Sequence, residues 1–236
     1  MSTASVSDTT SSLHEAIHNN HEQAVEHYLQ HDADTNAIDE RSNRDALQLA
    51  CLLGHAEIVE LLLSHGANPD SPGSIMMRPL EEAAYGGHKH IVEQLLGDGA
   101  KVRNGRKGPL YLAAARGHHH IVWLLIWNKA ETNPEVSFDA HGSPLVAAVH
   151  GGHSITVDWL LRCGANPNCA DYDYDGGYPL VEAAMIGRED LVVRLLQGKA
   201  RFDQLSPKTG ETALEAAKKR GHTEVIQVLR ALGAKE

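Results

Sequence analysis

Histidine is the residue type that most invites a chemical interpretation, because sixteen His occur among 236 residues. Two short runs concentrate them, His88-Lys89-His90 and His118-His119-His120. A zinc site needs three or four converging ligands, usually Cys and His at short spacing. The three cysteines, Cys51, Cys163 and Cys169, form no Cys-x-x-Cys pair. We therefore expect no physiological metal site and no cofactor, and at most adventitious metal on the second run.

Ionisable side chains are spread through the middle of the chain, where paired acid and base groups in an apolar cleft could transfer protons. The sequence has no Gly-rich phosphate loop, no Gly-x-Ser-x-Gly elbow and no kinase signature. Binding is therefore the default function, and a small-molecule site or an unusual enzyme is the alternative. The candidate polar groups for that alternative are Glu82, Tyr85, Tyr111, Arg116, His150 and Glu182.

The formal net charge of −10 argues against nonspecific binding to nucleic acid and against docking on an anionic membrane. Three sparse cysteines do not form a disulfide framework, which favours a reducing compartment. The first twelve residues are rich in Ser and Thr and lack an apolar core, so they predict a tail and not a signal peptide. No apolar run approaches transmembrane length. We expect a cytoplasmic protein, with the nucleus as the alternative.

A pattern that recurs along the chain must position these side chains. It runs Leu, a small pair such as Ala-Ala, Gly-His, Ile-Val, Leu-Leu and Gly-Ala, and residues 80–100 hold a clear copy. Each copy predicts two short helices, with a left-handed Gly between them and an apolar stripe on the second. The leucines that start the copies are Leu13, Leu47, Leu80, Leu110, Leu145, Leu180 and Leu214.

This pattern resembles the ankyrin repeat, a unit of about 33 residues that contains a turn and two helices. The resemblance covers about residues 9–236 and implies an all-α fold, an ankyrin-repeat α-solenoid of stacked helix-turn-helix units with hairpin-like loops. We expect a flexible Ser/Thr-rich tail over residues 1–8 and a single ankyrin-repeat domain over 9–236. The seven repeats are predicted at about 9–40, 41–74, 75–104, 105–138, 139–173, 174–207 and 208–236.

The resemblance also accounts for many of the histidines. Several follow the Gly between the two helices, or the Asn that replaces it, where the family implies a ring that hydrogen-bonds backbone. These are His21, His55, His88, His118, His153 and His222.

In ankyrin proteins the loop tips and the exposed side of each first helix form a concave face that carries recognition. Tyr and Met, which favour recognition surfaces, gather there in the middle repeats. A shortened loop in the fourth repeat, beside lengthened loops in the fifth and sixth, predicts a notch between Met76 and Ile186. The predicted contact residues are Met76, Met77, Glu82, Tyr85, Tyr111, Arg116, Phe138, His150, Tyr172, Tyr174, Tyr178, Glu182 and Met185. Packing of these side chains against neighbouring loops is the alternative.

Acidic residues are predicted to line the rim of the notch, namely Glu81, Glu82, Asp171, Asp173 and Asp175. Such a rim favours a partner protein in which basic residues flank an apolar segment. A solvated acidic surface is the alternative. We therefore expect a monomeric protein–protein interaction module of the scaffold, adaptor or inhibitor type.

The three tryptophans, Trp123, Trp127 and Trp159, fall on second helices, toward the convex side. We expect Trp127 to be exposed and Trp159 to be half-buried at a contact between repeats.

Overall fold

The computed structural model describes residues 6–72, 77–102, 107–133 and 142–235. Within these ranges the chain forms helices and no strands, as the predicted all-α class requires. The helices are α1 (Val6–His18), α2 (Glu22–Gln30), α3 (Ala46–Leu53), α4 (Ala56–Ser64), α5 (Pro79–Gly86), α6 (Lys89–Gly97), α7 (Pro109–Ala115), α8 (His119–Trp127), α9 (Pro144–His150), α10 (Ser154–Arg162), α11 (Pro179–Met185), α12 (Glu189–Gln197), α13 (Ala213–Arg220) and α14 (Thr223–Ala231).

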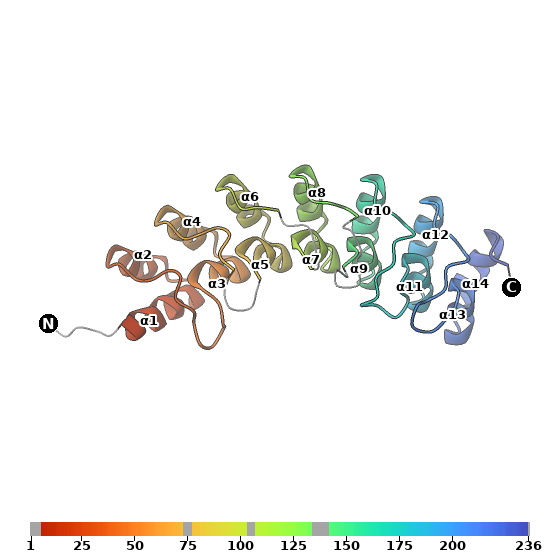
Figure 1. The fold of residues 1–236 in the computed structure, drawn as a ribbon, viewed down its shortest axis with the longest axis horizontal. Coiled ribbons are helices and arrows are strands. Elements are labelled where there is room, and N and C mark those ends of the chain that lie inside the picture. Colours follow the sequence, from red (N-terminus) through yellow and green to blue (C-terminus); the bar gives the residue numbers. More distant parts are fainter. Residues whose placement is uncertain (1–5, 73–76, 103–106, 134–141, 236) are drawn as a thin grey trace. The chain divides into compact units, whose positions relative to one another are not determined.

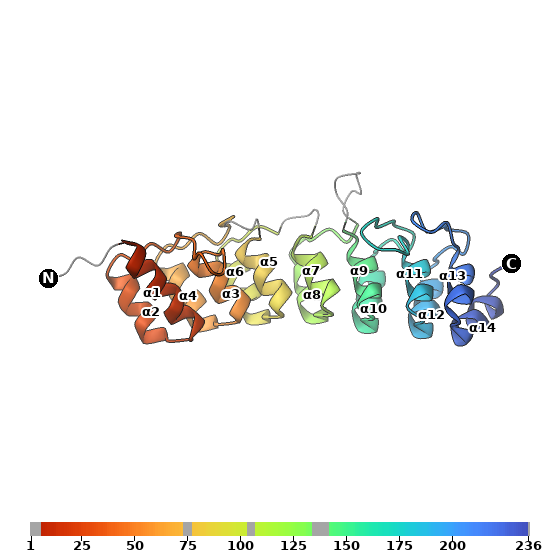
Figure 2. The same ribbon diagram turned by 90° about the horizontal axis from the view of Figure 1, so that it is seen from below.

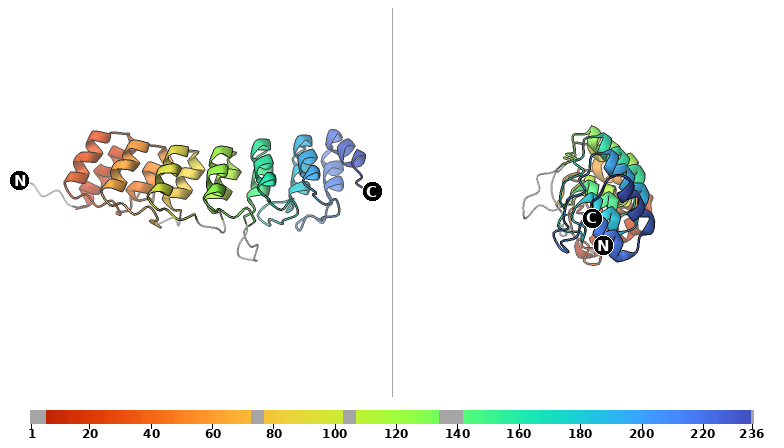
Figure 3. Two further views of the ribbon diagram at one scale, coloured as in Figure 1. Left: turned by 90° about the horizontal axis from the view of Figure 1, so that it is seen from above. Right: turned by 90° about the vertical axis from the view of Figure 1, so that its right-hand side faces the viewer.

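The chain divides into two compact units, residues 1–102 with α1–α6 and residues 103–236 with α7–α14, where the sequence predicts a single domain. In each unit the odd-numbered helices form one row and the even-numbered helices form a second row, drawn above the first in Figure 1. Each helix packs on its sequence neighbour and on the equivalent helix of the next pair, as α3 does with α4 and α5. The loops project from one edge of these rows (Figure 2; Figure 3, left).

The two rows differ because their sequences differ. First helices such as α5 start with Pro at the first turn, where the missing N–H costs nothing, and bury most of their residues. Second helices are amphipathic: in α6, Ile91, Val92 and Leu95 are buried while Glu93 faces solvent. Helices of seven to nine residues would be marginal alone, so packing between neighbouring pairs must hold them.

The Gly-His pair joins one repeat to the next. Gly54 ends α3 with a φ of 83°, and a Cβ built on it would lie 2.4 Å from Cε1 of His88. The His88 ring sits there because its Nε2 donates to the carbonyl of Leu52, at 3.0 Å. His153 and His222 bond the preceding repeat in the same way. The predicted backbone-binding role is therefore confirmed for these three histidines.

Arg188 takes the place of the histidine in one junction. Its Nη1 donates to the carbonyl of Gly152 at 2.9 Å, two residues beyond the carbonyl that the histidines of the other junctions reach. Its Nε and Nη2 also donate to the carboxylate of Asp190, and Ser154 Oγ donates to the same carboxylate at 2.5 Å. The guanidinium thus ties α12 to the start of α10.

Asn and Asp side chains link successive loops. In the first unit the backbone N–H of Lys101 donates to Asp70 Oδ1 at 3.1 Å. In the second unit the N–H of Arg201 donates to Asn168 Oδ1 at 2.8 Å. Each link joins residues about one repeat apart, so neighbouring loops support one another.

The first helix begins at Val6, inside the segment 1–8 that the sequence assigns to a flexible tail. Leu13 and Ile17 in the same helix are fully buried. Once that packing has nucleated a helix, each further residue extends it at little cost, even through a Ser/Thr-rich stretch. Among the described residues, no helix combines the length and the apolar character that crossing a bilayer needs.

Candidate functional site

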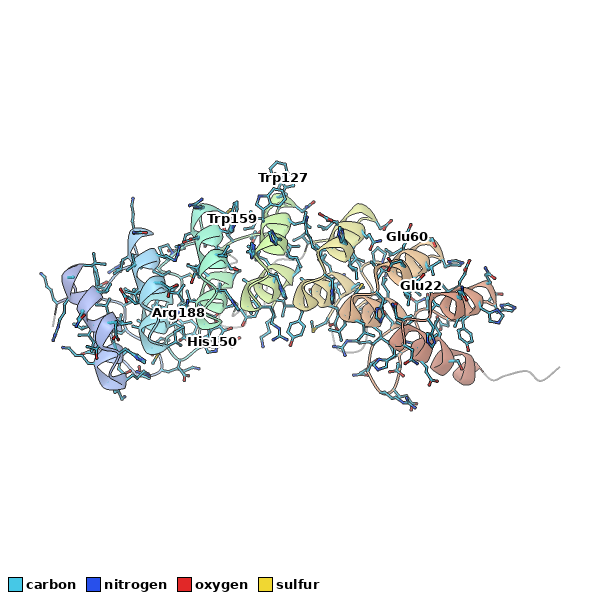
Figure 4. All side chains as sticks on the ribbon, turned by 180° about the vertical axis from the view of Figure 1, so that it is seen from behind. Glu22, Glu60, Trp127, His150, Trp159 and Arg188 are labelled. Atoms are coloured by element: carbon cyan, nitrogen blue, oxygen red, sulfur yellow. The ribbon has the colours of Figure 1, made fainter. Side chains whose placement is uncertain are left out.

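The second unit brings four of the predicted contact residues together. Tyr111 on α7, His150 at the end of α9 (Figure 4), Tyr174 in the loop before α11, and Glu182 on α11 form what we call the Tyr–His–Glu cluster. The two phenol oxygens of Tyr111 and Tyr174 are 2.8 Å apart. The ring of Tyr174 lies 4.6 Å from that of His150, between centroids. His150 Nδ1 is 2.6 Å from Glu182 Oε1.

The carboxylate of Glu182 also holds the loop backbone. The N–H of Gly176 donates to Glu182 Oε2 at 2.7 Å. The approach is so close that a Cβ on Gly176 would lie 2.5 Å from the Cα of Glu182. The Glu182 side chain is 4% exposed, whereas that of His150 is 55% exposed. The cluster is therefore a buried anchor with one ring at the surface.

Burial is the main cause of a raised pKa at the Tyr174 phenol, and its hydrogen bond with Tyr111 adds to the effect. The phenol therefore stays protonated near neutral pH. A protonated phenol can both donate and accept, so the pair of hydroxyls needs no ionised group to hold it.

The repeat pattern shows that Glu182 is an unusual choice. It stands two residues after its starting leucine, where other first helices carry Leu49, Leu112, Ala147 and Ala216. The first unit has two more such residues, Glu15 and Glu82; Glu15 is exposed, whereas Glu82 is fully buried. A buried carboxylate costs free energy unless it is paired and hydrogen-bonded.

Glu82 finds its partner in the loop before α3. Arg44 Nε donates to Glu82 Oε1 at 2.7 Å, and Arg44 Nη1 donates to the carbonyl of Ser42. Burial raises the pKa of the Glu82 carboxyl, and Arg44 opposes this effect. Each buried glutamate thus ties a first helix to a side chain about one repeat earlier, Arg44 for Glu82 and His150 for Glu182.

Asp171 fixes the other end of the loop that the cluster holds. Its buried carboxylate accepts from the N–H of Ser143 at 2.8 Å and from the N–H of Asp173 at 3.1 Å. Lys208 Nζ donates to Asp175 Oδ1 at 3.1 Å from the next loop. The segment 171–178, here called the tyrosine loop, is therefore held at both ends while Tyr172 remains 43% exposed.

The predicted contact residues fall into four groups. Tyr85, Arg116, His150 and Tyr172 are exposed; Met77, Tyr174 and Tyr178 are half-buried; Glu82, Tyr111, Glu182 and Met185 are buried; Met76 and Phe138 lie outside the described residues. The notch between Met76 and Ile186 stays a prediction, because it combines residues of both units.

The buried group corrects the sequence-based expectation of direct contact with a partner. Burial leaves Glu82, Tyr111, Glu182 and Met185 as internal packing and hydrogen-bonding residues, which is the alternative considered for them. The predicted acidic rim contains fewer exposed residues than expected, for the same reason. Glu81 and Asp171 are also buried, so Asp173 and Asp175 are the exposed acids of the predicted set.

The first helix carries a motif that sequence reasoning missed. His14-Glu15-Ala16-Ile17-His18 has the spacing with which two helical histidines bind zinc beside a glutamate base. Here His14 is buried and His18 is exposed, although both line a cavity of about 340 Å³. No group of three or more His, Cys, Asp or Glu side chains in the described part of the chain is placed to hold a metal ion. We therefore assign no metal centre to this motif.

The Tyr–His–Glu cluster has the chemical elements of an acid–base site, a carboxylate that orients an imidazole beside a phenol. The imidazole is open to solvent rather than enclosed. A cavity of about 810 Å³ lies beside α13, and its lining includes none of the four cluster residues. The arrangement is thus better suited to holding the tyrosine loop than to enclosing a substrate.

Comparison with known proteins agrees with the repeat. A family model described as ankyrin repeats (3 copies) matches residues 3–73, 80–171 and 145–235. The crystal structure of the human ASB11 ankyrin repeat domain superposes with a TM-score of 0.83 at 26% identity, covering 95% of this chain and 98% of that one.

Longer relatives contain similar stretches. The chain is 33% identical over 172 residues to ankyrin repeat and KH domain-containing protein mask-1 of Caenorhabditis elegans, covering 69% of the chain and 6% of that protein. It is 30% identical over 233 residues to ankyrin repeat domain-containing protein SAT10 of Stachybotrys chartarum, covering 94% of the chain and 11% of that protein. The chain thus spans a small part of these relatives' length. By sequence and by fold, it belongs to the ankyrin repeat family.

Proposed function

We propose that this protein binds another protein through the tyrosine loop and the adjoining ends of the first helices in the second unit. Ankyrin repeats are generally protein-interaction modules. The observation that carries the proposal is the double anchoring of the tyrosine loop, by Asp171 at one end and by Glu182 at the other. A loop that is fixed before binding loses little conformational entropy when a partner docks.

The exposed residues of this surface indicate the chemistry of the partner. Tyr172 offers a large ring, and the exposed carboxylates of Asp173 and Asp175 follow it in the loop, the second of them paired with Lys208. Tyr is enriched among residues that dominate binding energy, whereas flanking charges mainly set association rate and specificity. A segment with an apolar anchor between basic residues fits this surface. A cytoplasmic adaptor, scaffold or inhibitor would act in this way.

The test is affinity purification from the native source, followed by a direct binding measurement with the recovered protein. Tyr172→Ala combined with Asp173→Lys and Asp175→Lys is expected to weaken binding by about tenfold or more, since loss of one such anchor typically costs more than 1 kcal/mol. Tyr85→Ala is the matched control, because Tyr85 is similarly exposed, at 37%, but lies in the first unit. Equal affinities of the triple variant and the wild type would disprove the proposal.

A second measurement distinguishes residues that position the tyrosine loop from residues that contact the partner. Hydrogen exchange of residues 171–178 is expected to slow on binding and to speed up in Glu182→Leu, which cannot hold the N–H of Gly176. If binding protects other segments and leaves the tyrosine loop unchanged, the partner docks elsewhere.

A further inference from the structure

The second helices of the second unit carry a cluster of exposed apolar side chains that the proposed function does not use. Trp123 and Trp127 on α8 are 43% and 72% exposed, and Ile155 and Trp159 on α10 are 58% and 37% exposed. We call these four residues the tryptophan patch. The exposure of Trp127 confirms the sequence-based expectation, and Trp159 is partly covered, as expected. Figure 4 labels Trp127 and Trp159, which lie on the row of even-numbered helices.

The repeat does not need three of these four side chains. Equivalent positions in α4 and α6 carry polar or small residues in place of Trp123, Trp127 and Ile155. These are Glu60 and Glu93 for Trp123, Ser64 and Gly97 for Trp127, and Glu57 and His90 for Ile155. The position of Trp159 differs, because it is apolar in some repeats, with Leu61 in α4 and Leu124 in α8, and polar in others, with Gln94 in α6. Two repeats thus expose large apolar side chains where the compared repeats carry polar or small residues.

The patch forms two adjacent ridges. Trp123 and Trp127 are four residues apart on α8, and their rings stack with centroids 5.8 Å apart. Ile155 and Trp159 have the same spacing on α10, which packs beside α8. Residues four apart lie on one face of a helix, so each pair forms a continuous ridge on its own helix. A cavity of about 290 Å³ between the starts of the two helices includes Ile155 in its lining and continues the patch.

The size of the patch indicates what it binds. Taking about 200–250 Å² for each fully exposed ring and somewhat less for Ile, these fractions give roughly 450 Å² of exposed side chain. Continuous apolar patches of this size on a monomer are often functional. A stable dimer buries about 800 Å² on each partner, so the patch is too small for self-association by itself. It suits one short amphipathic helix, which lays an apolar stripe against a matching surface.

The charges around the tryptophan patch further limit the class of partner that it fits. After the last tryptophan of each helix, the first charged residue in the sequence is a cation, Lys129 after Trp127 and Arg162 after Trp159. Asp158 on α10 is ion-paired with Arg194. A second copy of the chain would bring the same cations against themselves. An anionic membrane would repel a chain of net charge −10.

We propose that the tryptophan patch binds an amphipathic helix of a partner protein, with acidic residues flanking its apolar stripe. This surface lies on the row of even-numbered helices, while the tyrosine loop lies at the edge of the same unit from which the loops project (Figures 1 and 2). The second unit therefore offers two separate faces, and one molecule can bridge two partners.

The test uses a designed helical peptide of about 18 residues, or five turns, with Leu along one face, Glu on both flanks and no Trp. All three tryptophans of the chain lie in the patch, so their fluorescence reports binding directly. We expect a blue shift on titration. Calorimetry should show an affinity at least about tenfold weaker for Trp123→Glu combined with Trp127→Ser, as loss of buried aromatic anchors predicts. The same peptide with Lys in place of Glu should bind more weakly.

The double variant introduces residues found at these positions in α4 and α6, so we expect it to fold like the wild type, as its thermal unfolding will show. It should leave binding at the tyrosine loop unchanged, which separates this proposal from the proposed function. The inference is overturned if the double variant binds the Glu peptide as tightly as the wild type does, or if the Lys peptide binds the wild type as tightly as the Glu peptide does. It is also overturned if anionic phosphatidylserine vesicles bind better than the Glu peptide. A fourth contrary outcome is the absence of any fluorescence shift up to about 1 mM peptide, which corresponds to a binding free energy of only about −4 kcal/mol.

Discussion

Two glycines in the first unit offer a controlled measurement of how strongly one repeat is coupled to the next. Gly54 and Gly66 have nearly identical left-handed backbones, with φ of 83° and 84°. A Cβ on Gly66 would meet nothing within 4 Å, whereas a Cβ on Gly54 would lie 2.4 Å from the ring of His88. The change of each glycine to Ala therefore shares the backbone strain and differs in the contact with the neighbouring repeat.

The magnitudes follow from these contacts. A left-handed Ala costs about 1–2 kcal/mol at either site. At Gly54 the ring of His88 must also move away, and the loss of its bond to the Leu52 carbonyl adds about 0.5–1.5 kcal/mol. We therefore expect Gly54→Ala to lower the free energy of unfolding by about 1 kcal/mol more than Gly66→Ala does.

Urea unfolding of the full chain measures both values, and His88→Ala completes the comparison. In the His88→Ala background the extra cost of Gly54→Ala should vanish, because the ring that it displaces is gone. Independent sites add to within about 0.3–0.5 kcal/mol. If Gly54→Ala and Gly66→Ala cost the same within that margin, or if the extra cost survives without His88, the Gly-His contact does not couple the repeats as described.

Three further predictions follow from buried or bridging side chains. Glu182→Leu should destabilise the chain by about 1–3 kcal/mol, since it leaves the buried N–H of Gly176 without its acceptor, and urea midpoints will measure the loss. Arg188→Ala should cost about 1 kcal/mol by calorimetry, since it loses the bond to the Gly152 carbonyl. Arg188→His should cost less than half as much, because the histidines at this position in other repeats bond a carbonyl of the preceding repeat; equal costs would contradict this role. The raised pKa of Glu82 means that the folded state holds its proton more tightly than the unfolded chain. The stability due to this group is therefore present below the ordinary value of 4.5 and is lost as pH rises through the folded-state pKa. Glu82→Leu should thus gain stability relative to wild type between pH 4 and pH 7, and a pH-independent difference would refute the assignment.

The recurring parts of the fold could be predicted from the sequence because each occurs several times. The Gly-His step shows in Gly54 and again in Gly87, and the spacing of Ile91, Val92 and Leu95 marks the buried side of a second helix. Repetition separates residues that the fold requires from residues that vary. The paired helices of each repeat were therefore accessible without a structure, and the family resemblance supplied the backbone role of His88.

The site was less accessible because it depends on pairs that join different repeats. Glu82 and Glu182 occupy a position on the first helix that the concave-face reading treats as exposed, yet both are buried. Their partners, Arg44 and His150, lie 38 and 32 residues away, and no periodicity connects them. Sequence reasoning named His150 and Glu182 in one list, but it took both as contacts for a partner. Residues that depart from the repeat pattern, such as Glu182, were the right ones to examine. Their hydrogen bonds to residues of a neighbouring repeat decided that they hold the fold together.

The links between neighbouring loops and helices also bear on how the protein responds to pulling. Each link, such as His153 to the Ala115 carbonyl or Arg201 to Asn168, joins residues about one repeat apart. Force applied along a unit therefore loads these links in series. A repeat of 34 residues, the separation of Leu13 and Leu47, extends to about 115 Å when unravelled. We expect a force–extension trace with steps of one repeat or small multiples of it, so that the chain yields gradually under tension and can reform when the tension falls.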